Sequence, residues 1–155
     1  MKLPKIKNIK GFTLIELLVV IGILAILLSI VLIAINPARQ FGQANDTKRR
    51  SAVTQVLNAI GAYAADNKGQ LPAGIPATTA REIGSGAGKA DLCTDLVPNY
   101  IPALPTDPRL NTADVTSADC AAYTTGYTVV KDATTTPRVT VSATGEITTD
   151  ISITR

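Results

Sequence analysis

A single carboxylate lies inside the longest apolar run of this 155-residue chain. The 24 residues from Phe12 to Ile35 carry one charged side chain, Glu16. An ionised carboxylate is costly in apolar surroundings and tends to take up a proton unless a cation lies near it. Inside a membrane-spanning segment, such a residue usually marks a function. Glu16 is therefore the first candidate functional residue, and a plain interfacial glutamate is the alternative.

The apolar run is long enough to cross a membrane. From Leu17 to Ile35 there are 19 uncharged residues, which as a helix would measure about 28 Å, close to the ~30 Å hydrocarbon core of a bilayer. Basic residues beside a spanning helix stay cytoplasmic, and four precede this one, at Lys2, Lys5, Lys7 and Lys10. We expect a single pass with the rest of the chain outside the cytoplasm. An ordinary secretory signal would have a shorter apolar core of about 7–15 residues.

The stretch from Lys7 to Ile26 reads KNIKGFTLIELLVVIGILAI. It resembles the N-terminus of the type IV filament family, which comprises type IV pilins and the pseudopilins of type II secretion. The resemblance implies cleavage by a prepilin peptidase between Gly11 and Phe12, followed by N-methylation of Phe12. It also implies that the Phe12 amine pairs with the Glu16 carboxylate, within one helix or between neighbouring subunits of a filament.

The sequence gives no support for catalysis. It contains no histidine, which excludes a Ser-His-Asp or Cys-His site and a His-ligated zinc. Residues 84–89, GSGAGK, resemble a phosphate-binding loop, but the glycine spacing is short by one residue and Ala90 stands where Ser or Thr is needed. We expect a flexible surface loop there, and we predict that the protein is not an enzyme.

Four aspartates could supply oxygen ligands to calcium, although they lack the EF-hand pattern. They are Asp107, Asp114, Asp119 and Asp132. We expect no metal site and no cofactor, and a structural calcium is the less favoured alternative.

The two cysteines, Cys93 and Cys120, fall in the part predicted to lie outside the cytoplasm, where disulfides can form. A bridge between them would contribute roughly 3–4 kcal/mol to stability. Two unpaired thiols are the alternative. The resemblance favours the bridge, because pilin heads often carry one.

Residues 12–36 are predicted to form the transmembrane and polymerisation helix, after a leader at residues 1–11. Gly22 inside this helix predicts close packing or a weak point. Pro37 predicts a kink, because it lacks an N–H and clashes with the preceding turn. We favour one continuous kinked helix; alternatively, Asn36 caps a second helix that has Pro37 in its first turn.

Residues 37–69 are predicted to be an amphipathic helix that ends at Asn67-Lys68-Gly69, with Gly69 as a left-handed cap. Its apolar residues recur at helical spacing, at Val53, Val56, Leu57, Ile60, Tyr63 and Ala64. The opposite face is polar and comprises Asp46, Lys48, Arg49, Arg50 and Gln55. We expect the basic run Lys48-Arg49-Arg50 to be a solvated face, and a filament contact or a membrane-surface cluster is the alternative.

Residues 70–125 are rich in proline and glycine and predict an irregular loop with one helical turn near residues 91–96. The stretch from Asp95 to Pro108 is similar to the segment that links helix to sheet in major pseudopilins and some pilins. Residues 126–155 predict a three-stranded antiparallel meander, with strands at 126–130, 138–143 and 146–153. The expected fold is α+β: a long N-terminal helix packed on a small antiparallel sheet of about three strands.

Removal of the leader would leave 11 basic and 12 acidic residues, a net charge of −1. The basic composition therefore gives no support for nucleic-acid binding. We expect a structural subunit of a type IV filament, held in the inner membrane until assembly. Its expected partners are copies of itself or related subunits, the prepilin peptidase, a platform protein and a cytoplasmic ATPase. The alternatives are a periplasmic major pseudopilin and a signal-anchored binding domain that never polymerises.

Overall fold

The computed structural model describes residues 11–135 and 137–155, so all of the predicted leader (residues 1–11) except Gly11 lies outside the described residues. The chain divides into two compact units, residues 1–38 and 39–155. The first unit holds helix α1 (Leu14–Ala34). The second, the head, holds nearly all of helix α2 (Pro37–Asp66) together with a four-stranded antiparallel sheet. This is the pilin-like α+β architecture that the sequence predicts.

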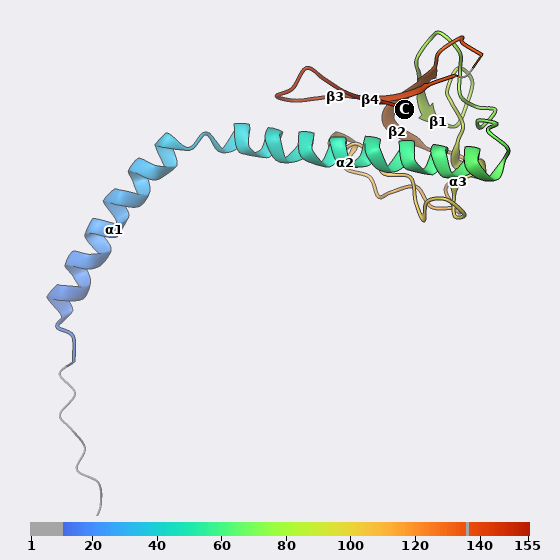
Figure 1. Ribbon diagram of the computed structural model, residues 1–155. Coiled ribbons are helices and arrows are strands. Elements are labelled where there is room, and N and C mark those ends of the chain that lie inside the picture. The colour runs from blue at the N-terminus through green and yellow to red at the C-terminus, as the bar shows by residue number, and fades with distance from the viewer. Residues whose placement is uncertain (1–10, 136) are drawn as a thin grey trace, which may run out of the picture. The chain divides into compact units, whose positions relative to one another are not determined.

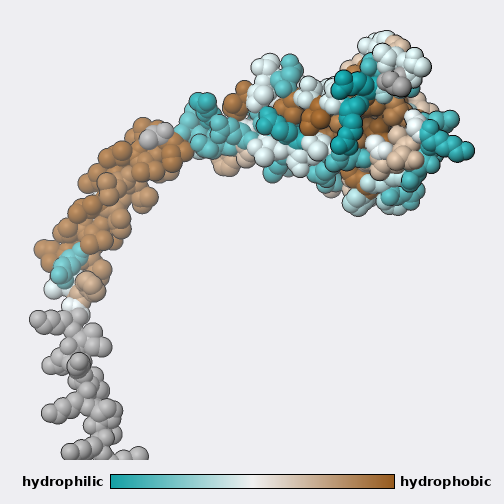
Figure 2. Space-filling view, in the orientation of Figure 1, coloured by the Kyte–Doolittle hydropathy of each residue, from teal (hydrophilic) through white to brown (hydrophobic). Residues whose placement is uncertain are grey.

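Helix α1 carries one charged side chain, Glu16, and its large hydrophobic side chains are exposed in the single chain; Figure 2 shows one face of it as mostly hydrophobic. Its segment Leu14–Ile33 is long and apolar enough to cross a membrane. The helix runs through Gly22 without interruption, and a Cβ added there would meet nothing within 4 Å. The Ser29 hydroxyl donates to the Ile26 carbonyl at 2.7 Å, so the helix itself satisfies this polar group.

Two helices are present instead of the single kinked helix that we favoured. Helix α1 ends at Ala34, Ile35 is extended (φ −94°, ψ 112°), and α2 begins at Pro37. Proline suits the first position of a helix, where its missing N–H costs no hydrogen bond, and it disfavours helical angles at the preceding Asn36. The alternative prediction, a second helix with Pro37 in its first turn, is the one confirmed.

The predicted apolar stripe of α2 forms one wall of the core of the head. Val53, Val56, Leu57 and Ile60 are all buried, as are Ala52 and Ala59 beside them. The helix stops at Asp66, and Gly69 adopts φ +85° while its N–H donates to the Ala64 carbonyl at 2.7 Å. The predicted left-handed glycine cap is therefore confirmed.

The sheet has the order β1-β2-β3-β4, and each strand is antiparallel to the next (Figure 1). The strands are β1 (Arg81–Gly84), β2 (Thr124–Lys131), β3 (Val139–Thr144) and β4 (Asp150–Thr154). The predicted count of three is one too few, because β1 was assigned to the irregular loop. The predicted third strand also began too early: residues 146–149 form the loop between β3 and β4.

The irregular segment is a packed layer of the head. It contains the predicted helical turn, α3 (Cys93–Leu96), and a short 3₁₀ helix, η1 (Pro108–Leu110). Apolar side chains from this segment enter the core, including Ile75, Leu92, Leu96, Ile101, Leu104 and Val115. The loop after β1 is anchored at its far end, where the Lys89 ammonium lies 3.1 Å from the Glu82 carboxylate and Ala90 is fully buried. Residues 86–88 are exposed, as expected of a surface loop, and the flexibility of this loop stays a prediction.

Candidate processing and assembly site

The predicted cleavage point lies just before α1, in a non-helical and exposed stretch. Gly11 and Phe12 precede the helix, and the Phe12 residue is 83% exposed. A Cβ added to Gly11 would meet nothing within 4 Å. The peptide bond between them is therefore not covered by any described part of the chain.

The Glu16 side chain turns back toward this point and closes the first turn of α1. Its Oε2 accepts the Thr13 N–H and the Thr13 hydroxyl, each at 2.8 Å, while the Glu16 N–H donates to Thr13 Oγ1 at 3.3 Å. This reciprocal pair is a capping box, which satisfies N–H groups that a helix start leaves without partners. The carboxylate is thereby held at Thr13, the residue that follows Phe12.

Capping is a role for Glu16 that sequence reasoning missed, although Thr13 and Glu16 have the spacing that signals it. The predicted pairing partner, an α-amine on Phe12, would exist only after cleavage. In the chain described here Phe12 is linked to Gly11 through an ordinary peptide bond. The pairing of Glu16 with the amine therefore stays a prediction.

A second polar centre lies in the head and was not predicted. Arg49, assigned from the sequence to a solvated face, is fully buried. Its Nε and Nη2 donate to the two carboxylate oxygens of Asp107 at 2.7 and 2.9 Å. Its remaining donors reach Asp46 Oδ1 and Glu146 Oε1, each at 2.9 Å. We call these four residues the Arg49 cluster.

Asp46, also assigned from the sequence to the polar face, fixes the loop between β3 and β4. Its carboxylate accepts the N–H groups of Glu146, Ile147 and Thr148 at 2.7, 2.9 and 2.9 Å. Burial alone would raise the pKa of Asp46, but these N–H groups and the Arg49 guanidinium outweigh it and hold the pKa well below its usual range.

In the other members of the cluster, too, the pKa shifts favour the charged form: the pKa is lowered for the carboxylates and raised for Arg49. Burial would raise the pKa of Asp107, yet its hydrogen bonds from Arg49 lower it overall. Arg49 likewise lowers the pKa of Glu146. The bonds to Asp107, opposed by burial, raise the pKa of Arg49. One buried cation thus joins α2, the segment before η1 and the β3–β4 loop, with all three carboxylates ionised.

The spacing of residues along α2 indicates that Asp46 and Arg49 are buried. Gly42, Asp46 and Arg49 follow the spacing of four and three that continues into Val53 and Val56, so all five residues lie on one face of α2. All five are buried. The sequence shows that the charged residues share the face of the apolar stripe, but not the carboxylates that meet Arg49 from 58 and 97 residues away.

The predicted disulfide is present and joins Cys93 to Cys120, with 5.4 Å between their Cα atoms. Near it, the Tyr123 hydroxyl accepts the N–H groups of Leu92 and Cys93 at 3.0 and 3.1 Å and donates to Asp91 Oδ1 at 2.9 Å. Burial, together with Asp91, raises the pKa of Tyr123 to about 12. The disulfide and the tyrosine together hold α3 against the segment that leads into β2.

The four aspartates considered for calcium do not come together. Asp107 is bound to Arg49, and Asp132 accepts the Thr134 hydroxyl and the Arg138 N–H. Asp114 and Asp119 do border one surface pocket of about 480 Å³.

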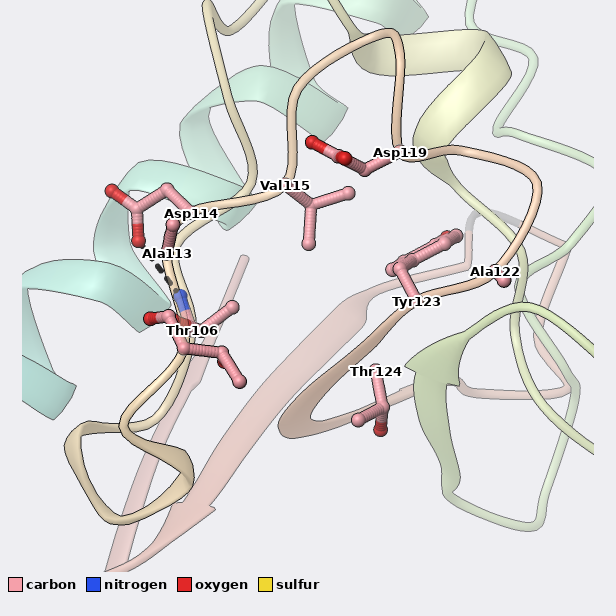
Figure 3. A pocket seen from close by; sticks show the side chains of 9 residues that line it. Thr106, Ala113, Asp114, Val115, Asp119, Ala122, Tyr123 and Thr124 are labelled. Atoms are coloured by element: carbon pink, nitrogen blue, oxygen red, sulfur yellow. Dashed lines mark hydrogen bonds between the residues drawn. The ribbon is translucent and has the colours of Figure 1, made fainter.

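In that pocket, each of the two carboxylates accepts a nearby backbone N–H, and Figure 3 draws the hydrogen bond at Asp114. Asp114 accepts the Thr106 N–H at 3.1 Å, and Asp119 accepts the Thr116 N–H at 3.0 Å. Within the described residues, no group of three or more His, Cys, Asp or Glu side chains is placed to hold a metal.

Comparison with known proteins addresses the N-terminal site. Residues 6–32 match the family model described as the prokaryotic N-terminal methylation motif, and this range includes Gly11, Phe12 and Glu16. The chain therefore carries the prepilin-type cleavage and methylation motif that type IV pilins and pseudopilins share. No curated protein and no solved structure gave a significant match to the chain.

Proposed function

We propose that the protein is a non-enzymatic structural subunit of a type IV filament. The observation that carries this proposal is the methylation motif, located where an exposed Gly11–Phe12 bond precedes an apolar helix. A prepilin peptidase cleaves that bond, and Phe12 becomes the N-methylated first residue. The subunit waits in the inner membrane with its head outside the cytoplasm. A platform protein and a cytoplasmic ATPase then drive its transfer into the filament.

In this proposal α1 is the polymerisation element. Its apolar surface has no polar side, so it suits lipid before assembly and the helices of neighbouring subunits afterwards. The Thr13 N–H directs the Glu16 carboxylate to the start of the helix, which supports our proposal that it pairs with the new Phe12 amine of the same chain or of a neighbour. This pairing fixes the axial position of each incoming subunit.

The disulfide supports a head outside the cytoplasm, because such bonds persist in oxidising compartments and are rare in the reducing cytoplasm. Two other functions agree with the same motif and anchor: a periplasmic major pseudopilin of type II secretion, and an anchored binding domain that does not polymerise. The location of the processed chain, on the cell surface or with the cells, distinguishes a surface pilus from these two alternatives.

The test is the intact mass of the protein in a fraction sheared from the cell surface, with and without reduction. We expect residues 12–155 plus one methyl group, lighter by two hydrogens before reduction. Gly11→Ala is the control, because it should leave the chain full length and absent from that fraction. Processed protein found only with the cells would favour a pseudopilin. A full-length, unmethylated wild-type chain would reject the filament proposal.

A further inference from the structure

Strand β4 forms one edge of the sheet and is bonded to a strand on one side only, to β3 (Figure 1). The strand at the other edge, β1, is covered on its outer side. There the Ala90 N–H donates to the Glu82 carbonyl at 2.8 Å, and the Gly84 N–H donates to the Ala90 carbonyl at 3.0 Å. An uncovered edge presents unpaired N–H and C=O groups and is a template for another strand. Within the described sheet, β4 is the open edge.

The ladder between β3 and β4 shows which backbone groups of β4 are free. Val139 and Arg155 exchange both of their N–H···O bonds, at 2.8 and 3.0 Å. Bonded and non-bonded pairs alternate along an antiparallel ladder, and the register of these two strands has no shift. The N–H and C=O groups of Asp150, Ser152 and Thr154 therefore point away from β3. All three residues are exposed, and no other described segment bonds to these backbone groups.

The features that usually block an exposed edge are missing from β4. Proteins protect such edges with lysine, proline, inward-pointing charges or bulges. The sequence of β4 is Asp-Ile-Ser-Ile-Thr, and its one charged residue, Asp150, stands at the end of the strand. The next charged side chain, Arg155, donates through Nη1 to Asn58 Oδ1 of α2 at 3.0 Å. The middle of the edge carries small hydroxyl side chains, which leave the backbone accessible to a second strand.

A second copy of β4 fits this edge in the antiparallel direction. With a two-fold axis at Ser152, the two Ser152 residues lie opposite each other, and Asp150 lies opposite Thr154 of the second copy. Each of these three pairs can form two backbone hydrogen bonds, about six in all. The two Asp150 carboxylates lie at opposite ends of the pairing, each facing a threonine hydroxyl that can donate to it. Like charges directly opposite each other would destabilise the pair, and this register has none.

The inner face of this pairing is apolar. In the same register Ile151 lies opposite Ile153 of the second copy, and the two-fold axis repeats this pair. Ile151 is buried in the single chain, but Ile153 is only partly buried. Pairing brings the isoleucines into cross-strand contact and covers the exposed part of Ile153. The edge is therefore complementary to itself in backbone bonds, in charge and in apolar contact.

We propose that two copies of the chain pair edge to edge through β4, which joins their sheets into one of eight strands, four from each copy. Because β1 is covered, a second copy has only β4 to offer, so the contact is isologous and closes at two subunits. A filament needs contacts that continue from each subunit to the next, so the pair is a form of the unassembled chain. Pairing through β4 does not require that the chain forms filaments.

The pair is expected to be weak. Stable interfaces bury about 1,200–2,000 Å², and an edge strand of five residues offers less than this. The paired form is therefore populated where copies are concentrated, and a covalent trap is the suitable way to detect it.

Cysteine cross-linking tests the register. The two natural cysteines are bonded to each other, so an introduced cysteine is the one free thiol. The full chain in detergent micelles is oxidised mildly, and the dimer is measured on a non-reducing gel. Ser152→Cys should form a dimer, because the Cα atoms of a bonded pair are about 5.5 Å apart, within the range of a disulfide. Thr154→Cys is the matched control on the same strand. In this register the two Thr154 residues are at least about 13 Å apart, so it should form at least about tenfold less dimer.

A mixture of Asp150→Cys and Thr154→Cys chains should cross-link although neither variant does so alone, because these two positions lie opposite each other. Adding Ser152→Lys to both chains places two like charges at the centre of the pairing, and the mixed dimer should fall about fivefold. The unfolding midpoint of Ser152→Lys should match that of the wild type, since Ser152 is exposed.

Equal amounts of dimer from Ser152→Cys and Thr154→Cys would overturn the proposal, because collisions without a register would then explain the cross-links. A mixture of Asp150→Cys and Thr154→Cys that yields no more dimer than either chain alone would overturn it too. So would a mixed dimer that Ser152→Lys leaves unchanged.

Discussion

Arg49 and Asp107 are joined by two parallel hydrogen bonds, Nε to Oδ2 at 2.7 Å and Nη2 to Oδ1 at 2.9 Å, although 58 residues separate them in sequence. This forked geometry is the strongest form of a guanidinium–carboxylate pair. Since Arg49 also binds Asp46 and Glu146, its loss would leave three carboxylates near one another without their shared cation.

Replacement of Arg49 should therefore destabilise the head strongly. Arg49→Met keeps the volume of the side chain and removes the charge, and breaking a buried ion pair in this way costs about 3–5 kcal/mol. Arg50→Met is the matched control, because Arg50 is exposed on the next position of α2, and it should change stability by less than about 0.5 kcal/mol. The measurement is denaturant unfolding of the full chain in detergent, followed by circular dichroism. Equal midpoints for the two variants would contradict the role of the cluster.

The same cluster predicts that acid destabilises the head. The pKa values of Asp46, Asp107 and Glu146 are all lowered in the folded state. The unfolded chain then binds more protons than the folded chain, so this contribution is complete above the ordinary carboxyl pKa. It should be lost progressively as the pH falls below about 4. Unfolding midpoints measured across this range check the sign. In Arg49→Met the slope should flatten, because burial of Asp107 is no longer offset; an unchanged slope would count against this assignment.

Substitutions at Glu16 separate its charge from its capping role. Glu16→Ala should leave processing intact and sharply lower filament yield. Glu16→Gln keeps an oxygen that can accept the Thr13 N–H but lacks the charge, so it should assemble as poorly as Glu16→Ala. Thr13→Ala removes the capping hydroxyl, costs the helix start about 1 kcal/mol and should still assemble. Yield in the sheared fraction is the measurement. Normal filaments from Glu16→Gln would show that the carboxylate serves only the cap.

Loss of the disulfide should loosen the layer formed by residues 70–125. The bond closes a loop with a sequence separation of 27, which corresponds to about 3–4 kcal/mol of stabilisation. Cys120→Ser is the milder variant, because Cys120 is only partly buried whereas Cys93 is fully buried. Its unfolding midpoint should match that of the reduced wild-type chain. A reduced wild-type chain as stable as the oxidised one would contradict the prediction.

The sequence was enough to predict the elements whose structure depends on residues close together in the chain. The apolar run of α1, the stripe from Val53 to Ile60 and the glycine cap at Gly69 each depend on neighbours in the chain. The β2 and β3 strands also show in the sequence, as runs rich in β-branched residues. The candidate site around Gly11, Phe12 and Glu16 could also be predicted, because its residues are neighbours in the chain.

What escaped prediction depends on distant partners. Strand β1 has the sequence Arg-Glu-Ile-Gly, with one strong strand former, and it is a strand because it pairs with β2 across 40 or more residues. Arg49 was assigned to solvent because arginine is rarely buried without a partner. Its partners Asp107 and Glu146 lie in segments that no periodicity connects to α2. Tertiary context overrode the local preference in both cases.

The position of the Arg49 cluster along α2 also has a mechanical consequence. Tension that enters the head through the start of α2 reaches Asp46 and Arg49 before it reaches Ala52, the first buried apolar residue of the helix. The resistance of the head to a pull is therefore set first by short, directional, charge-assisted bonds and only afterwards by apolar packing. Bonds of this kind break over small displacements, so the head should be stiff under load and brittle, and it should yield at lower force in acid.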